Sequence, residues 1–185
     1  MGYIFDPSAL QQFATNRIGA PIDQMSRSII DDLASAHPGH VETKQDWFFN
    51  IAGGATGIMT VLHASLSEYL ILFGTPVGTE GFSGRYRIDI FDIVLAGEMW
   101  TYAEDHFSER MVYRPGDLAL LKRRRVKGFR LLEGCWLLEY GRGPIPTCLP
   151  MAVSGAFASL DAATLWKTIR IYSRLVIKEL LHGKI

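Results

Sequence analysis

Short runs of alternating hydrophobic and polar residues fill the middle of the chain, from about residue 45 to residue 142. They are rich in branched and aromatic side chains and are separated by glycine, which is typical of β-strands. Many short strands with closely spaced turns favour a barrel or sandwich over a parallel sheet. The pattern predicts strands at residues 47–51, 67–73, 85–95, 99–103, 117–121, 128–132 and 135–140.

Helices are predicted on both sides of these strands. Proline is tolerated in the first turn of a helix and aspartate caps one, so both residues mark helix starts. The predicted helices begin at Asp6-Pro7, at Pro21, at 146–150 and at Asp161, and the last three end near residues 36, 159 and 182. A further short helix is predicted at 55–64, because Gly53 and Gly54 interrupt the first strand.

Length and composition favour one domain. The chain has 185 residues, of which 48% are hydrophobic and 21% charged. This is long enough to bury one hydrophobic core but too short for two domains of ordinary size. We therefore predict an α+β fold, mainly β, with a single domain over 1–185. Its parts are N-terminal helices at 1–36, a β-barrel at 45–142 and C-terminal helices at 145–185.

The charge balance argues against a nucleic-acid partner, because nineteen basic and nineteen acidic residues cancel. The densest basic run lies at 122–127. We interpret it as a solvated hairpin turn, with binding of anionic lipid headgroups as the alternative.

Neither a metal site nor a cofactor is expected. The five histidines have none of the spacings of common zinc sites. His37-Pro-Gly-His40 comes nearest to a ligand pair, but its proline and glycine predict a turn. Cys135 and Cys148 make no disulfide framework and favour a reducing compartment.

The polar cluster at His63, Ser65, Ser67 and Glu68 contains a serine and a histidine that a hydrolase could use. Neither serine lies in a Gly-x-Ser-x-Gly elbow, so we interpret the cluster as one that holds a loop in place.

Membrane contact is predicted to be peripheral. No apolar stretch is long enough to span a bilayer, and no signal peptide is evident. Along the last helix a basic stripe lies beside a wide apolar surface. A helix packed on the barrel and an interfacial membrane helix explain this pattern equally well. The stripe consists of Lys167, Arg170, Arg174 and Lys178.

Two acidic residues lie inside predicted strands, Asp92 in 85–95 and Glu139 in 135–140. Strand alternation places Asp92 on one face with Ile90 and Val94, and Glu139 on one face with Leu137. Buried carboxylates are rare unless they are paired or hold a proton. The two acids therefore predict a proton-handling or cation-binding cavity; a structural acid satisfied by backbone N–H groups is the alternative.

Several longer motifs between residues 37 and 174 are specific. They include His37-Pro-Gly-His-Val41, His63-Ala-Ser-Leu-Ser-Glu-Tyr69, Ser83-Gly-Arg-Tyr86 and Glu139-Tyr-Gly-Arg-Gly143. Through them the chain resembles the family that contains fungal sterol C8-isomerase and the animal sigma-1 receptor.

This resemblance implies a cupin-like β-barrel with two C-terminal helices packed across its mouth as a membrane-facing cover, assembled as a homotrimer. It also implies a sealed apolar cavity for a sterol or an amphiphilic amine. In the family, a glutamate at the position of Glu139 is the counter-ion of a bound cation, and an aspartate at the position of Asp92 hydrogen-bonds it. The cavity-lining positions carried over are Met59, Tyr69, Ile71, Phe73, Tyr86, Ile90, Leu149, Ala152 and Tyr172.

The chain also departs from the family. The receptor has other residues at the positions of Ala55, Leu121 and Leu131, so we expect a differently shaped cavity. Eukaryotic members carry an N-terminal membrane helix that this sequence lacks, which indicates a bacterial relative or a chain whose anchor was removed. We expect membrane association without a transmembrane helix, at the endoplasmic reticulum if eukaryotic and at the cytoplasmic membrane face if bacterial.

The function that these features predict is a sterol Δ8 to Δ7 isomerase without a cofactor. A proton adds at C9, a carbocation forms at C8, and a proton leaves C7. Glu139 would donate the proton and an ionised Asp92 would stabilise the cation, although the two roles could be reversed. The alternatives are a non-catalytic receptor for sterols or cationic amphiphiles and a metal-dependent cupin enzyme. The chain lacks the His-x-His pair of the latter.

Overall fold

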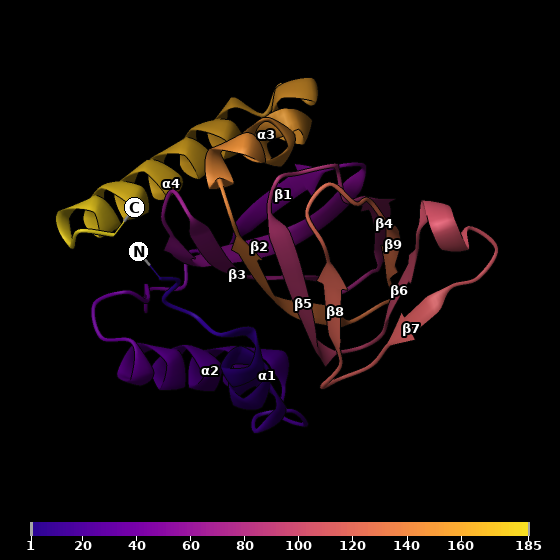
Figure 1. Ribbon diagram of the computed structural model, residues 1–185, viewed down its shortest axis with the longest axis horizontal. Coiled ribbons are helices and arrows are strands. Elements are labelled where there is room, and N and C mark those ends of the chain that lie inside the picture. The colour runs from indigo at the N-terminus through magenta and orange to yellow at the C-terminus, as the bar shows by residue number, and fades with distance from the viewer. Residues whose placement is uncertain (1, 185) are drawn as a thin grey trace.

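The computed structural model of the chain describes residues 2–184, which form two antiparallel β-sheets and four α-helices (Figure 1). The helices are α1 (Pro7–Thr15), α2 (Ile22–Ala36), α3 (Leu149–Ala158) and α4 (Ala162–Leu181), with short 3-10 helices η1 (Glu104–His106) and η2 (Ile145–Thr147). The strands are β1 (Phe48–Ala52), β2 (Ala55–Ala64), β3 (Glu68–Thr75), β4 (Thr79–Phe82), β5 (Asp89–Ala96), β6 (Met99–Tyr102), β7 (Met111–Tyr113), β8 (Leu118–Leu121), β9 (Gly128–Leu131) and β10 (Cys135–Arg142).

The strands divide into a six-stranded sheet, in the order β1-β2-β3-β10-β5-β8, and a four-stranded sheet, in the order β4-β9-β6-β7. No strand pair among residues 2–184 joins the two sheets, so they form an open cupin-like sandwich. The predicted α+β class, mainly β and cupin-like, is confirmed. The two sheets do not close into a barrel, because each keeps its own edge strands.

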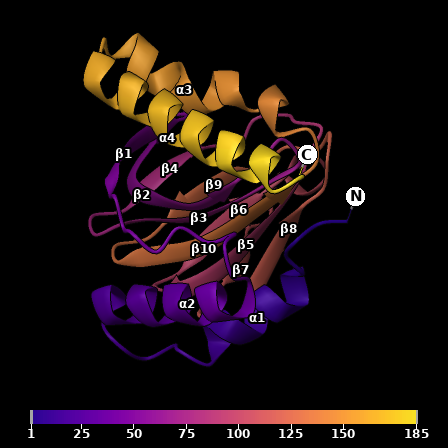
Figure 2. The same ribbon diagram turned by 90° about the vertical axis from the view of Figure 1, so that its left-hand side faces the viewer.

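Helices α1 and α2 cover the outer face of the six-stranded sheet (Figures 1 and 2). Alternate residues of the central strands, among them Leu72, Ile93 and Leu138, point to this side and pack against Leu10 and Leu33 of the helices. The predicted start of α1 is confirmed, because the Asp6 side chain accepts hydrogen bonds from two backbone amides of the first turn.

Helices α3 and α4 lie on the opposite side of the molecule from α1 and α2 (Figures 1 and 2). Leu175 and Val176 of α4 are buried against the inner-face core. Helix α3 packs closely on β1: a Cβ at Gly155 would lie 2.2 Å from the carbonyl oxygen of Ile51. The predicted cap of α4 is confirmed by a 3.0 Å hydrogen bond from the Thr164 amide to Asp161. No helix formed by residues 2–184 is long and apolar enough to cross a membrane.

The helix predicted at 55–64 is wrong, because these residues form strand β2. Gly53 and Gly54 have φ angles of 59° and 89° and connect Ala52 directly to Ala55, its partner in the β1–β2 pair. Two consecutive residues with positive φ are typical of a type I′ hairpin turn. The two glycines therefore join two strands rather than ending one.

Three other sequence-based predictions need correction. The strand predicted at 85–95 begins only at Asp89, and β4 and β7 were missed because they are short. The basic run at 122–127 is not a hairpin turn, since it crosses from β8 in the six-stranded sheet to β9 in the four-stranded sheet. Several of its charges are paired at the surface; Arg123, for example, lies 2.7 Å from Asp89.

Candidate active-site cavity

Glu139 and Asp92 face each other across two neighbouring strands. Strand β10 is hydrogen-bonded to both β3 and β5, and its register places Glu139 directly opposite Asp92. Directly opposed residues in an antiparallel pair have Cβ atoms roughly 4.5–5.5 Å apart. Both side chains lie on the inner face, as strand alternation predicts, with Val94 and Leu137 beside them.

A cavity of about 210 Å³ lies over these two acids, between the sheets and against α3 and α4. Its wall is mostly apolar, and its charged lining residues are Asp92, Lys127 and Glu139. All nine positions that the family resemblance indicated contribute to the wall, namely Met59, Tyr69, Ile71, Phe73, Tyr86, Ile90, Leu149, Ala152 and Tyr172. Ala55 and Leu121, where the chain departs from the receptor, line it too.

The Glu139 carboxyl is placed to hold a proton near neutral pH. Burial, followed by the negative charge of Asp92, raises the pKa of Glu139 from its usual 4.5 to about 7. The hydroxyl of Tyr69 donates a 2.6 Å hydrogen bond to Glu139. This bond and the positive charge of Lys127 both lower the pKa of Glu139, but by less than burial and Asp92 raise it. Burial also raises the pKa of Tyr69 well above its ordinary value, so this phenol remains a donor.

The hydrogen bond from Tyr69 to Glu139 depends on the glycine at position 141, which has no side chain. Tyr69 pairs with Gly141, two residues beyond Glu139 on the same face of β10. A Cβ at Gly141 would lie 2.2 Å from the Tyr69 ring, so the ring occupies the space above the glycine. In this position its hydroxyl reaches along the strand to Glu139.

Asp92 has a different partner from Glu139. The ammonium of Lys127 forms an ion pair with Asp92, and the two side chains are only 12% and 5% exposed. Because buried carboxylates are stable mainly when they are paired, the lysine compensates the charge of Asp92 inside the cavity.

Sequence reasoning missed Lys127 by treating the basic run at 122–127 as one solvated block. A signal was nevertheless present. Lys127 precedes Phe129 and Leu131 at strand spacing, so alternation places the three on one face. Phe129 lines the cavity and Leu131 is fully buried, which identifies that face as the inner one.

The polar cluster that includes His63 and Glu68 lies outside the cavity. The hydroxyl of Ser65 accepts hydrogen bonds from the amides of Ser67 and Glu68 in the β2–β3 turn, as expected for a cluster that holds a loop. The carboxylate of Glu68 accepts a 2.9 Å hydrogen bond from Tyr140 and lies 2.8 Å from the Lys184 ammonium. These contacts hold the loop and the sheet together, and none of them pairs Ser65 with His63 as a nucleophile and its base would be paired.

The cysteines form no disulfide with each other. Cys135 is buried and Cys148 lines the cavity, both as free thiols. Burial raises the pKa of each thiol to about 12, which leaves both protonated and poor nucleophiles.

Comparison with known proteins identifies the class to which this fold and cavity belong. Residues 1–184 match the sequence family described as "ERG2 and Sigma1 receptor like protein", and the chain belongs to this family. The match confirms the resemblance found in the sequence and extends beyond the motifs at 37–174.

Individual relatives within the family fall into two named groups. The chain is 40% identical over 187 residues to "C-8 sterol isomerase ERG2" of Gibberella zeae, covering 99% of this chain and 79% of the relative. It is 37% identical over 180 residues to "Sigma non-opioid intracellular receptor 1" of Taricha granulosa, covering 96% and 80%. Among solved structures, KdgF from Halomonas sp. is similar with a TM-score of 0.46 and 16% identity, over 56% of this chain and 93% of that one.

Proposed function

We propose that this protein is an isomerase that moves a sterol double bond from Δ8 to Δ7. The observation that carries the proposal is the environment of Glu139, a carboxyl with a pKa raised to about 7 in an apolar cavity, directly opposite Asp92. The relatives named C-8 sterol isomerase support the choice of reaction.

The reaction needs a strong acid near a weakly basic double bond, and a fixed negative charge near the cation that follows. Protonation at C9 produces a tertiary cation at C8, and loss of a proton from C7 forms the new double bond. Glu139 is the donor in this scheme, because its carboxyl keeps a proton near neutral pH. The C7 proton returns to the carboxyl pair, which ends the cycle with the single proton it started with, so no cofactor is required.

Asp92 and Lys127 contribute the electrostatic part of the scheme. The ion pair holds a negative charge on the same wall as Glu139, where a carbocation would form. With Glu139 protonated, the three groups sum to zero charge, which suits a neutral sterol entering an apolar cavity. The cluster becomes negative only when Glu139 loses its proton.

The apolar wall of the cavity and one polar group in it support a sterol of the membrane as the substrate. The volume of about 210 Å³ is below the roughly 300–1,000 Å³ of pockets that enclose drug-sized ligands, so binding of a sterol requires that α3 and α4 move or that part of the sterol stays outside. The hydroxyl of Tyr172 lines the cavity and has no hydrogen-bond partner among the described residues. It is placed to bond the hydroxyl of a sterol.

We further propose that α3 and α4 lie against the membrane surface, as expected for the delivery of a lipid substrate. Both helices expose large apolar residues on their outer side, including Phe157 and Leu160 at the end of α3 and Trp166, Ile177 and Leu181 on α4. Part of the predicted basic stripe is used within the molecule: Lys167 lies 2.6 Å from Asp46, and Arg174 lies 2.6 Å from Glu42. The homotrimer that the resemblance implies stays a prediction, which light scattering of the purified protein tests.

The second candidate is a receptor that binds sterols or cationic amphiphiles without turnover. It is supported by relatives named sigma non-opioid intracellular receptor and by the carboxyl of Glu139, which can pair with a ligand ammonium when ionised. Both candidates use the same cavity and differ only in turnover.

The experiment that separates them is incubation of the purified protein with a Δ8-sterol in heavy water. An isomerase produces a Δ7-sterol with one deuterium at C9, detected by mass spectrometry, whereas a receptor binds the sterol and produces none. Glu139→Gln and Asp92→Asn should each lower turnover by about 100-fold or more. Glu133→Gln replaces an exposed acid and is the matched control. Near-normal turnover by Glu139→Gln would remove this residue from the mechanism.

A further inference from the structure

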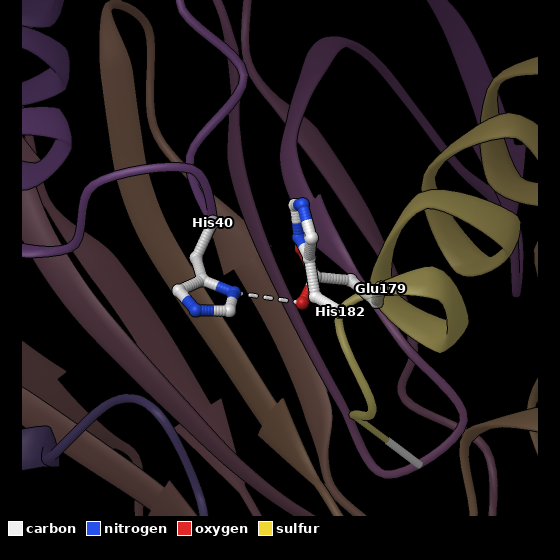
Figure 3. A group of neighbouring side chains, drawn as sticks. All are labelled: His40, Glu179 and His182. Carbon is white, nitrogen blue, oxygen red and sulfur yellow. Dashed lines mark hydrogen bonds and ion pairs between the residues drawn. The ribbon is translucent and has the colours of Figure 1, made fainter.

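A second group of chemically active side chains lies outside the cavity, where the end of α4 meets the turn that follows α2. His40 comes from this turn, Glu179 from the last turn of α4, and His182 caps the same helix. Figure 3 shows the three side chains gathered between the two segments. Each offers one ligand atom, and these atoms all lie within 4.8 Å of one another.

The local backbone explains why the three residues converge. Glu179 and His182 are three positions apart at the end of α4, so they lie on one side of the helix. In the facing turn, Gly39 has a φ of 84°, a conformation that favours glycine, and this turn brings the backbone next to the His182 ring. The rings of His40 and His182 stand edge to face, with centroids 5.7 Å apart.

Glu179 is a buried carboxylate without a permanent cation beside it. It is only 2% exposed, and its ion-pair partners among residues 2–184 are two histidines: His40 at 2.8 Å and His63 at 3.7 Å. The nearby basic side chains Arg174 and Lys184 pair with Glu42 and Glu68 instead. Buried carboxylates are normally compensated by a cation or by a metal ion, so this position lacks a charge that a metal would supply.

The donor atoms suit a divalent transition metal. Two imidazole nitrogens and one carboxylate oxygen form the protein part of many zinc sites, which leave a fourth position open. Two ligands on one tetrahedral zinc ion lie about 3.3 Å apart, given bond lengths of roughly 2.0–2.1 Å. The Nδ1 atom of His40 and the Oε2 atom of Glu179 are 2.8 Å apart, so a small opening places an ion between them. His182 is exposed at the end of α4, where a fourth ligand from solvent can reach the ion.

We propose that His40, Glu179 and His182 form a binding site for Zn²⁺ or a similar divalent transition metal, which ties the end of α4 to the turn after α2. The Nδ1 atom of His63 lies 3.7 Å from the second oxygen of Glu179 and makes its hydrogen bond, 2.8 Å long, with the carbonyl oxygen of His40, which holds the backbone of this ligand in place. The site is separate from the cavity and does not depend on the isomerase proposal, because none of the described cavity-lining residues is a histidine. Since α4 covers the cavity, a bound ion would hold one end of that cover in place.

The test uses the full chain, with any purification tag removed and metals stripped by a chelator. Titration calorimetry with Zn²⁺ should show one ion per chain, and Co²⁺ should give the strong visible absorption of a four-coordinate site. His182→Gln should weaken Zn²⁺ binding by about tenfold or more. His182 is exposed, so this change leaves the fold intact. His106→Gln, at an exposed histidine in η1, is the matched control and should bind as the original chain does.

Thermal unfolding provides an independent measurement. Zn²⁺ should raise the midpoint of the original chain and of His106→Gln, because an ion that binds only the folded state stabilises it. At the same Zn²⁺ concentration it should raise the midpoint of His182→Gln or His40→Gln clearly less. The proposal is overturned if the original chain binds no Zn²⁺, or if His182→Gln binds it as tightly as the original chain.

Discussion

At the scale of single residues, the cavity gives two similar carboxyls different environments. Glu139 accepts a hydrogen bond from Tyr69 and its pKa is raised to about 7, whereas Asp92 is paired with the ammonium of Lys127. The acid and the fixed charge that the proposed reaction needs are thus supplied by residues of the same type. In the proposed mechanism these partners favour Glu139 as the proton donor.

The titration of Glu139 should move catalysis and cation binding in opposite directions. Isomerisation needs the protonated carboxyl, which is the dominant form below about pH 7, so turnover should fall as pH rises through this value. Binding of a cationic amphiphile needs the ionised carboxyl and should strengthen over the same range. Rate profiles and titrations with a permanently charged amphiphile measure the two trends. Parallel trends, or an unchanged binding profile in Glu139→Gln, would contradict this account.

Loss of Lys127 should destabilise the protein through Asp92. Lys127→Met leaves a buried carboxylate unpaired, which costs about 3–5 kcal/mol of the free energy of unfolding. Adding Asp92→Asn removes the uncompensated charge and should recover most of this loss. Urea denaturation of the two single variants and the double variant measures the coupling, and additive effects would show that the two side chains do not interact.

At the scale of the elements, the register of β10 builds the site. This strand lies between β3 and β5, so one register brings Glu139 opposite Asp92 and Gly141 opposite Tyr69. A slip of one residue would turn Glu139 toward the outer face, into the core formed with α1 and α2. The large inward and outward apolar residues of β10 make such a slip costly, and this protects the site.

The outer side of α4 should govern binding to membranes. Trp166 is 66% exposed on this helix, and its replacement by glutamate places a charge where we propose that lipid lies. Trp166→Glu should weaken binding to phospholipid vesicles by about tenfold, the effect of losing roughly 1.4 kcal/mol of apolar transfer. Phe107→Glu is the matched control, since Phe107 is 82% exposed beside η1. Co-sedimentation should separate the two, and an equal loss in both variants would exclude α4 as the binding surface.

At the scale of the whole molecule, Glu68 connects both ends of the described chain to the sheet. Its carboxylate accepts a 2.8 Å hydrogen bond from the Ile4 amide and pairs with Lys184 at the same distance. The Lys184 ammonium also donates a 2.9 Å hydrogen bond to the carbonyl oxygen of Gly2. These contacts hold the segment after α4 beside the segment before α1, and therefore fix one end of the cavity cover.

Breaking this connection should destabilise the fold. Lys184→Met leaves the fully buried Glu68 without its cation, at a cost of about 3–5 kcal/mol. Combining it with Glu68→Gln should restore part of the stability. Lys44→Met, at an exposed lysine, is the control and should change the free energy of unfolding by less than about 0.5 kcal/mol. Chemical denaturation measures all four proteins; equal stability of Lys184→Met and Lys44→Met would show that the pair is not stabilising.

Features that depend on near neighbours were predictable. The caps at Asp6 and Asp161, the C-terminal helices and the inward orientation of Asp92 and Glu139 follow from capping chemistry and from alternation along a strand. The mistakes at β2 and at the basic run arose where a local pattern has two solutions. Gly53 and Gly54 can end a strand or turn a hairpin, and Lys127 can face solvent or the space between the sheets.

The sequence by itself determined the fold class, the family, the two inward acids and the residue types of the cavity wall. Only the tertiary structure decided that Lys127 neutralises Asp92, that Tyr69 occupies the space above Gly141, and that His40 meets Glu179. These contacts join residues far apart along the chain or on different sheets. Their geometry depends on strand register and on the path between the sheets, which emerge only when the whole core packs.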